Sequence, residues 1–170
     1  MMWINKQALM ACLLVTACIA GNAKADVPFA SAVDAAVRNY NRATAKVATG
    51  GAPGAAAMAK LKAAGIEHLV DFRTEGEGIA ETKAAAEAAG LSYSSLPLGR
   101  GRPGQALVED FAEIMQQHQE DDVYLFCASG NRAGTVWAYY RKQQGVPVEI
   151  AIEEGRAAGM AASREAWLKQ

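Results

Sequence analysis

The chain has 170 residues, of which 51% are hydrophobic and 21% charged, and its formal net charge is −1. This length and composition suit one globular domain with a core of its own. A nearly neutral, slightly acidic chain without a basic face is a poor candidate for binding nucleic acid, so we expect no such partner.

The first 25 residues have the composition of a secretory signal peptide. Lys6 gives a positive start, residues 8–20 are almost wholly apolar, and residues 23–25 (AKA) have the small-x-small pattern that signal peptidase accepts. The apolar stretch is shorter than the roughly 20 residues that a membrane-spanning helix needs. The pattern predicts a signal peptide at residues 1–25 and a single domain at residues 26–170 of an exported, periplasmic protein. A buried N-terminal helix is the alternative.

A second interpretation of the leader depends on Cys18. Residues 15–18 (VTAC) resemble a bacterial lipobox, in which the cysteine is lipidated and becomes the new N-terminus. The protein would then be an anchored lipoprotein, whereas without that lipid we expect no contact with a membrane. Removal of residues 1–25 shifts the formal charge from −1 to −3, because two lysines and no acid are lost.

Downstream of the leader, segments of helical and strand character alternate. Apolar residues recur at helical spacing within 26–45, and glycine and proline mark a turn at 50–54. In chain order the pattern then predicts a helix over 55–64, a strand over 66–72, a helix over 79–89, a strand over 91–98, a helix over 105–118, a strand over 122–126, and helices over 132–144 and 147–158.

This alternation predicts an α/β fold with a mainly parallel sheet flanked by helices. Ligands bind such sheets at the carboxyl ends of the strands. Three loops leave those ends, at residues 73–78, 99–104 and 127–132, and we expect them to converge on one site.

Cys127 is the one cysteine left once the leader is removed. In an oxidising compartment a thiol without a partner is either buried and inert or kept for its reactivity. The strand over 122–126 leads directly into Cys127, and Arg132 then opens a helix. Such a loop turns its backbone N–H groups and the positive helix end inward, which favours an anion and a thiolate. The alternative is a buried cysteine followed by an ordinary turn.

The loop resembles the signature loop of cysteine-dependent protein tyrosine and dual-specificity phosphatases. More closely, it resembles the phosphatase-like domain of bacterial beta-lactamase-hydrolase-like proteins, over about residues 38–160. That resemblance implies a phosphatase-like fold, Cys127 as nucleophile and Arg132 as the residue that grips phosphate, with the residues between them lining the anion site: Ala128, Ser129, Gly130 and Asn131. Further matching segments are residues 39–40, 51–53, 61–66, 69–73, 88–91 and 96–97.

The chain departs from the phosphatase pattern in four places. Four residues, where phosphatases usually have five, separate Cys127 from Arg132, and this spacing also resembles the rhodanese loop that holds a persulfide. Phe126 replaces the usual histidine, and Ala133 replaces the usual hydroxyl residue. The loop 99–104 lacks the aspartate that serves as general acid, so we expect low activity.

Several charged residues of the neighbouring loops are candidates for the same site. Arg100 and Arg102 are expected to hold an anionic substrate, unless they are simply solvated. Glu75 or Glu77 is a candidate replacement for the missing acid, with solvated loop charges as the alternative. Arg73 is expected either to order its own loop or to assist anion binding.

Neither a cofactor nor a metal is expected. His68 and His118 have no second ligand at useful spacing, and the glycines of the 99–104 loop match a dinucleotide fingerprint without a correctly placed acid. The sequence thus predicts a monomer that acts on a phosphorylated or other anionic substrate. The leading hypothesis is phosphate-ester hydrolysis through a phosphocysteine at Cys127. Sulfur transfer through a persulfide and a non-catalytic anion-binding module remain as alternatives.

Overall fold

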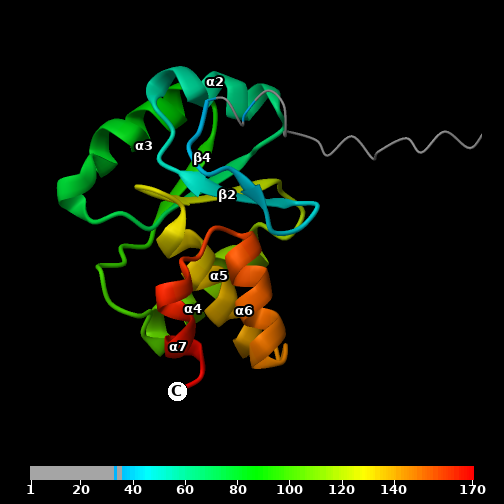
Figure 1. The fold of residues 1–170 in the computed structure, drawn as a ribbon. Coiled ribbons are helices and arrows are strands. Elements are labelled where there is room, and N and C mark those ends of the chain that lie inside the picture. The colour runs from blue at the N-terminus through cyan, green and yellow to red at the C-terminus, as the bar shows by residue number, and fades with distance from the viewer. Residues whose placement is uncertain (1–32, 34–35) are drawn as a thin grey trace, which may run out of the picture.

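The computed structural model describes residue 33 and residues 36–170 (Figure 1). The predicted signal peptide at residues 1–25 and the lipobox around Cys18 lie outside the described residues. Within the described part of the chain, no helix is both long and apolar enough to cross a membrane. The same part contains no cluster of three or more histidine, cysteine, aspartate or glutamate side chains suited to a metal ion.

A five-stranded sheet forms the centre of the fold, in the order β1-β2-β5-β3-β4. Strand β1 (Asn41–Arg42) pairs antiparallel with β2 (Val47–Gly51), and every other pairing is parallel. The central strand β5 (Val123–Cys127) lies between β2 and β3 (His68–Asp71), and β4 (Ser92–Ser95) forms the far edge. The predicted α/β class, with a mainly parallel sheet flanked by helices, is therefore confirmed.

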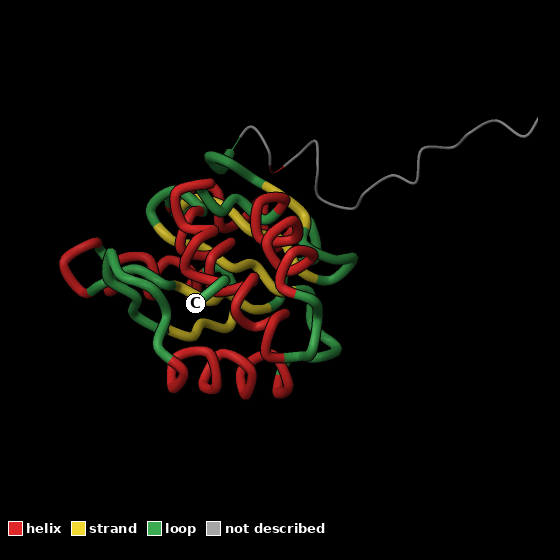
Figure 2. The backbone as a smooth tube through the Cα atoms, turned by 60° about the horizontal axis from the view of Figure 1, so that its bottom comes forward, coloured by secondary structure: helices red, strands yellow, loops and turns green. Residues whose placement is uncertain are grey.

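Helices cover both faces of the sheet, as the views in Figure 1 and Figure 2 show. On one face lie α2 (Ala55–Ala63) and α3 (Ile79–Ala88), whose buried side chains pack on Leu69, Tyr124 and Phe126 of the strands. On the other lie α4 (Gln105–Gln117) and α5 (Asn131–Gln143), packed on Val70, Leu125 and Cys127. Helices α6 (Val148–Ala157) and α7 (Glu165–Leu168) pack behind α5 in a smaller core.

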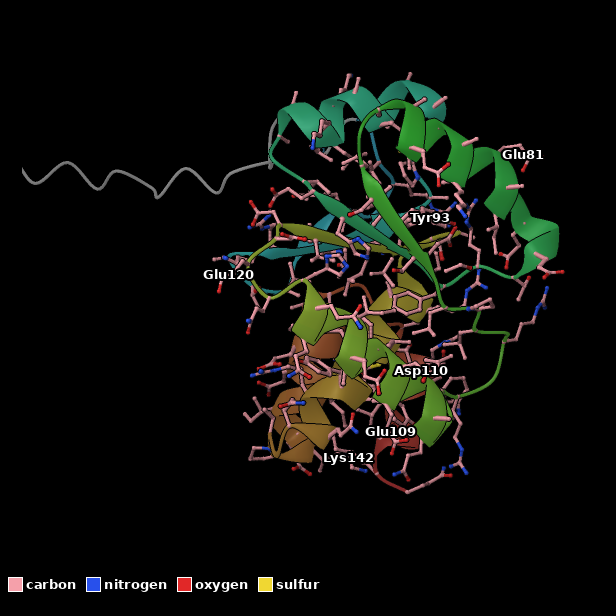
Figure 3. The ribbon with its side chains drawn as sticks, turned by 180° about the vertical axis from the view of Figure 1, so that it is seen from behind. Glu81, Tyr93, Glu109, Asp110, Glu120 and Lys142 are labelled. Atoms are coloured by element: carbon pink, nitrogen blue, oxygen red, sulfur yellow. The ribbon has the colours of Figure 1, made fainter. Side chains whose placement is uncertain are left out.

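Acidic side chains lie on the outer sides of α3 and α4. Figure 3 labels Glu81 on α3 and Glu109 and Asp110 on α4, and all three side chains are exposed to solvent. The predicted helices and strands downstream of residue 54 agree with the observed bounds to within one to three residues.

The segment before α2 differs from the prediction. Of the segment 26–45, where apolar residues recur at helical spacing, residues 26–32 and 34–35 lie outside the described residues, and Val33 is helical. Asn41 and Arg42 instead form a short strand, because they pair with Thr49 and Ala48 of β2. The turn predicted at 50–54 begins late, because Gly50 and Gly51 end β2 instead. A Cβ at Gly50 would lie 2.3 Å from the hydroxyl oxygen of Tyr124, so only glycine lets the strand pass this buried ring.

The C-terminal residues also fold beyond the last predicted helix. A short 3₁₀ turn, η2 (Ala162–Arg164), leads into α7, and the side chain of Leu168 is fully buried. Single-turn helices leave little periodicity in a sequence, so no pattern in residues 159–170 marked them.

Candidate active site

The cysteine lies where the central strand ends. Cys127 is the last residue of β5 and pairs with Gly51 of β2, while β3 and β4 end beside it on the same edge. The side chain of Arg132, in the first turn of α5, connects the three loops at that edge. Its Nη1 donates to the carbonyl oxygens of Leu98 at 2.9 Å and Phe72 at 3.3 Å. The predicted convergence of the loops is therefore observed.

The turn between Cys127 and α5 depends on Gly130. This residue has φ +87° and caps α5, and a Cβ on it would lie 2.8 Å from Nδ2 of Asn39 and 3.2 Å from the carbonyl carbon of Gly50. Asn39 Nδ2 donates to the carbonyl oxygen of Ser129 at 3.0 Å, which fixes that peptide group. A side chain at position 130 would be strained and would also disturb the contact with β2.

The thiol of Cys127 lies beneath this turn and is 1% exposed. The backbone N–H of Arg132 donates to its Sγ at 3.3 Å. Sulfur thus sits at the N-terminal end of a 13-residue helix, the end that carries partial positive charge. This arrangement places a cysteine sulfur at the end of the central strand.

Glu77 holds the guanidinium of Arg132 in a bidentate ion pair. The Nη2–Oε1 distance is 2.6 Å and the Nη1–Oε2 distance is 2.8 Å. Oε2 of Glu77 also accepts from the backbone N–H and the hydroxyl of Thr74, both at 2.8 Å. The hydrogen bond from Arg132 is the largest cause that lowers the pKa of Glu77 to about 2. The same bond raises the pKa of Arg132.

This ion pair bears on the expectation that Glu77 replaces the missing general acid. A carboxyl with a pKa of about 2 is ionised at neutral pH and has no proton to donate while Arg132 holds it. Glu77 instead occupies the oxygen-binding fork of Arg132, the position that a phosphate would need.

A cavity of about 420 Å³ opens at these loops and is lined by Thr74, Glu77, Gly99, Arg100, Arg132 and Arg164. Three guanidinium groups face one carboxylate in that lining, so its charge is positive. Arg100 therefore lies where the sequence placed it. Arg164, on η2, went unnoticed because it lies beyond the last predicted helix and belongs to no motif.

Arg73 does not line the cavity, which corrects the expectation that it assists anion binding. Its guanidinium pairs with the fully buried carboxylate of Asp71, with an Nη2–Oδ2 distance of 2.7 Å. The same Nη2 also donates to the Thr82 hydroxyl at 2.7 Å, and Nη1 donates to the Glu77 carbonyl at 2.8 Å. Tyr93, labelled in Figure 3, donates to Oδ2 of Asp71 at 2.6 Å. The geometry fits the other expectation, that Arg73 orders the loop carrying Glu77.

Two further candidates also lie elsewhere. Nη1 of Arg102 donates to Oε1 of Gln170 at 3.0 Å, and Arg102 lines a neighbouring cavity with Trp167. Glu75 is exposed and absent from the lining of the arginine cavity. The loop that carries Arg102 turns toward the C-terminal helix, which sequence alone did not reveal.

The remaining residues of the cysteine loop are not among those that line the arginine cavity. Ala128 is exposed, and the peptide oxygen of Ser129 is bound by Asn39. Asn131 directs its Oδ1 to the backbone N–H of Ala161, at 2.9 Å, and so ties the cysteine loop to the C-terminal segment.

Residues 39–145 match a family profile described as "Beta-lactamase hydrolase-like protein, phosphatase-like domain". The match spans more than half of the chain and includes β1 to β5, the cysteine loop and Arg132. No curated protein matches the sequence.

Solved structures of phosphatase type resemble the whole described fold. A Shewanella putrefaciens protein described as a DUF442 phosphatase candidate shares 20% identity at a TM-score of 0.66, over 79% of this chain and 87% of its own. A Neisseria meningitidis phosphatase candidate shares 22% identity at a TM-score of 0.67, over 75% of this chain and 94% of its own. P. aeruginosa TpbA, solved with phosphotyrosine, shares 24% identity at a TM-score of 0.61, over 76% of this chain and 80% of its own. At these identities the likeness concerns the fold.

Proposed function

The chain belongs to the family of beta-lactamase hydrolase-like phosphatase-like domains, and from that membership we propose that it hydrolyses phosphate esters through a phosphocysteine at Cys127. The observation that carries the proposal is the hydrogen bond from the backbone N–H of Arg132 to Cys127 Sγ, because the side chain of the same arginine lines a cavity with two further arginines. Thiolate, helix end and guanidinium are the groups that such chemistry requires.

Substrate binding begins with an exchange at Arg132. The phosphate of the substrate replaces the Glu77 carboxylate on the two guanidinium nitrogens, since both anions use the same bidentate geometry. Glu77 thereby acts as a competitor of the substrate.

In the first chemical step the thiolate of Cys127 attacks phosphorus. A bond forms between Sγ and phosphorus while the bond from phosphorus to the ester oxygen breaks, and the released alcohol takes a proton from water. The N–H groups of the loop and the guanidinium of Arg132 stabilise the charge on the equatorial oxygens. In the second step a water molecule attacks phosphorus, releasing inorganic phosphate and restoring the thiolate.

Steady-state hydrolysis of p-nitrophenyl phosphate tests this proposal. Cys127→Ser keeps the size of the side chain but replaces the thiolate with a much weaker nucleophile, so kcat/KM is expected to fall at least about a thousandfold. Arg102→Gln, on a loop outside the arginine cavity, is the control and should stay within about twofold of the parent. Turnover that survives in Cys127→Ser would contradict the covalent mechanism.

A further inference from the structure

Arg164 reaches the arginine cavity from outside the part of the chain that matches the family. The match ends at residue 145, whereas Arg164 ends the η2 turn near the C-terminus. It nevertheless lines the cavity together with Arg132 and Arg100. Burial is the main cause that lowers the pKa of Arg164. Cys127 and Arg132 also affect this pKa, because Arg164 lies close to the cysteine loop.

The segment that carries Arg164 is held firmly against the cysteine loop. Asn131, inside that loop, accepts the backbone N–H of Ala161. Gly134, one turn along α5, allows backbone contact, because a Cβ there would lie 2.4 Å from the nitrogen of Met160. On the far side, Tyr139 donates to the carbonyl oxygen of Trp167 at 2.9 Å. Arg164 is therefore positioned by the same elements that shape the anion site.

Arg73, which is buried, and Arg164, which is half-buried, differ in how their donors are used. Every guanidinium nitrogen of Arg73 donates to Asp71, Thr82 or a backbone carbonyl, as expected of a structural arginine. The guanidinium of Arg164 instead stacks on the ring of Trp167, with Cζ 4.8 Å from the ring centroid. Among the described residues none accepts a hydrogen bond from its Nη1, although that atom is buried.

A buried guanidinium nitrogen that lacks an acceptor, as Nη1 of Arg164 does, is costly in a folded protein unless it serves a ligand. The stacking on Trp167 fixes the plane of the group without neutralising its charge. Glu77, the one carboxylate in the cavity lining, is already engaged by Arg132. The positive charge of Arg164 thus remains available to an anion that binds beside Arg132.

We propose that Arg164 is a specificity-determining residue that binds a second anionic group of the substrate, next to the phosphate held by Arg132. This inference rests on the proposed function, because it takes the Cys127 loop as the phosphate site. The preferred substrates are phosphate esters that carry another phosphate or carboxylate close to the reacting group. Arg100, exposed at the cavity rim, adds to the attraction of such substrates.

Binding of two stable anions tests the proposal without any turnover. Isothermal titration calorimetry compares inorganic phosphate, a single anionic group, with imidodiphosphate, which has two adjacent groups and a bridge that resists hydrolysis. The parent should bind imidodiphosphate at least about tenfold more tightly than phosphate, a difference of about 1.4 kcal/mol. Arg164→Gln should remove most of that preference while changing the phosphate Kd less than about threefold.

Two further variants separate a specific contact from general charge. Arg102→Gln removes the same charge from a neighbouring loop and should retain the full preference for imidodiphosphate. Arg164→Lys retains the charge without the planar fork, so its preference should be intermediate. A thermal melt of each variant confirms that it is folded.

Equal weakening of both anions in Arg164→Gln, or no weakening of either, would overturn the inference. A loss of preference in Arg102→Gln as large as that in Arg164→Gln would also overturn it, because the effect would then be one of net charge. Failure of the proposed function would look different: Cys127→Ser would retain turnover, whatever the ratio of the two binding constants.

Discussion

At the scale of single residues, the site is organised around one guanidinium. Arg132 contacts the carbonyl oxygens of two neighbouring loops and the Glu77 carboxylate, and its own N–H contacts the cysteine sulfur. The positions of Cys127 and Arg132 could be predicted because chemistry restricts which residues end a strand and open a helix there. The engagement of Glu77 could not, because it depends on a side-chain contact between residues 55 positions apart.

Replacement of Arg132 by lysine tests the role of the planar fork. An ammonium cannot engage two phosphate oxygens in parallel, so Arg132→Lys should weaken phosphate binding by about 2 kcal/mol, roughly thirtyfold. Arg102→Lys is the matched control and should change the affinity by less than about twofold. Calorimetry with inorganic phosphate measures both. Equal losses at the two positions would place Arg132 outside the anion site.

Replacement of Glu77 by glutamine tests its role as a competitor of the substrate. Glu77→Gln should raise the affinity for sulfate several-fold at pH 7, because the incoming anion no longer displaces a carboxylate. Sulfate is the suitable probe since it does not titrate in the working range. If Glu77 were instead the acid of the reaction, the variant would lose turnover and keep the parent affinity for sulfate.

The stability of the same variant, Glu77→Gln, should depend on pH differently from that of the parent. The pKa of Glu77 is lowered to about 2 in the folded protein, so the ion pair stabilises the fold at pH values above the ordinary carboxyl range. Glu77→Gln should be less stable than the parent by about 1 kcal/mol at pH 7. That difference should shrink as the pH falls from about 4.5 toward 2. A difference that persists unchanged at acid pH would contradict the ion pair.

At the scale of elements, close contacts of α5 with β2 and with the C-terminal segment hold the site together. The sequence predicted the short buried strands β3 and β5 and the 13-residue helix α5. It did not predict β2, whose Gly50 and Gly51 have the composition of a turn and are required by the ring of Tyr124 across the sheet. Nor did it predict η2, which is fixed by contacts with Asn131 and α5.

A methyl group at Gly134 tests the packing of α5 against the C-terminal segment. The added Cβ would lie 2.4 Å from the nitrogen of Met160 and 2.7 Å from the carbonyl oxygen of Ala158, and backbone atoms cannot simply rotate away. Gly134→Ala should therefore lower the free energy of unfolding by about 2 kcal/mol. Gly104→Ala is the control, since its Cβ would meet nothing within 4 Å. Urea denaturation that finds equal stabilities would show that the segment is free to shift.

At the scale of the whole molecule, the described fold presents its positive cavity at the carboxyl edge of a parallel sheet, the usual place for a ligand in this architecture. The α/β class followed from the order of elements alone. The arginine cavity did not, because the residues that form it come from four separate segments between Thr74 and Arg164.

The cellular setting is a proposal that rests on the leader sequence. We propose that the protein is exported and that cleavage follows the AKA pattern of residues 23–25. The intact mass of the protein recovered after expression with its leader should correspond to a chain that begins at Asp26. A lipid-modified Cys18 at the N-terminus would show instead that the protein is a membrane-anchored lipoprotein.

Trapping of the covalent intermediate tests the central claim most directly. The parent is mixed with p-nitrophenyl phosphate, quenched in acid during turnover and analysed by intact-mass and peptide mass spectrometry, with a parallel sample incubated with thiosulfate. We predict a single added phosphoryl group on Cys127, absent from Cys127→Ser, and no added sulfur in the parallel sample. Sulfur on Cys127 without phosphate would favour sulfur transfer. A chain that carries neither group and turns over no ester would contradict the account and leave a non-catalytic anion-binding module.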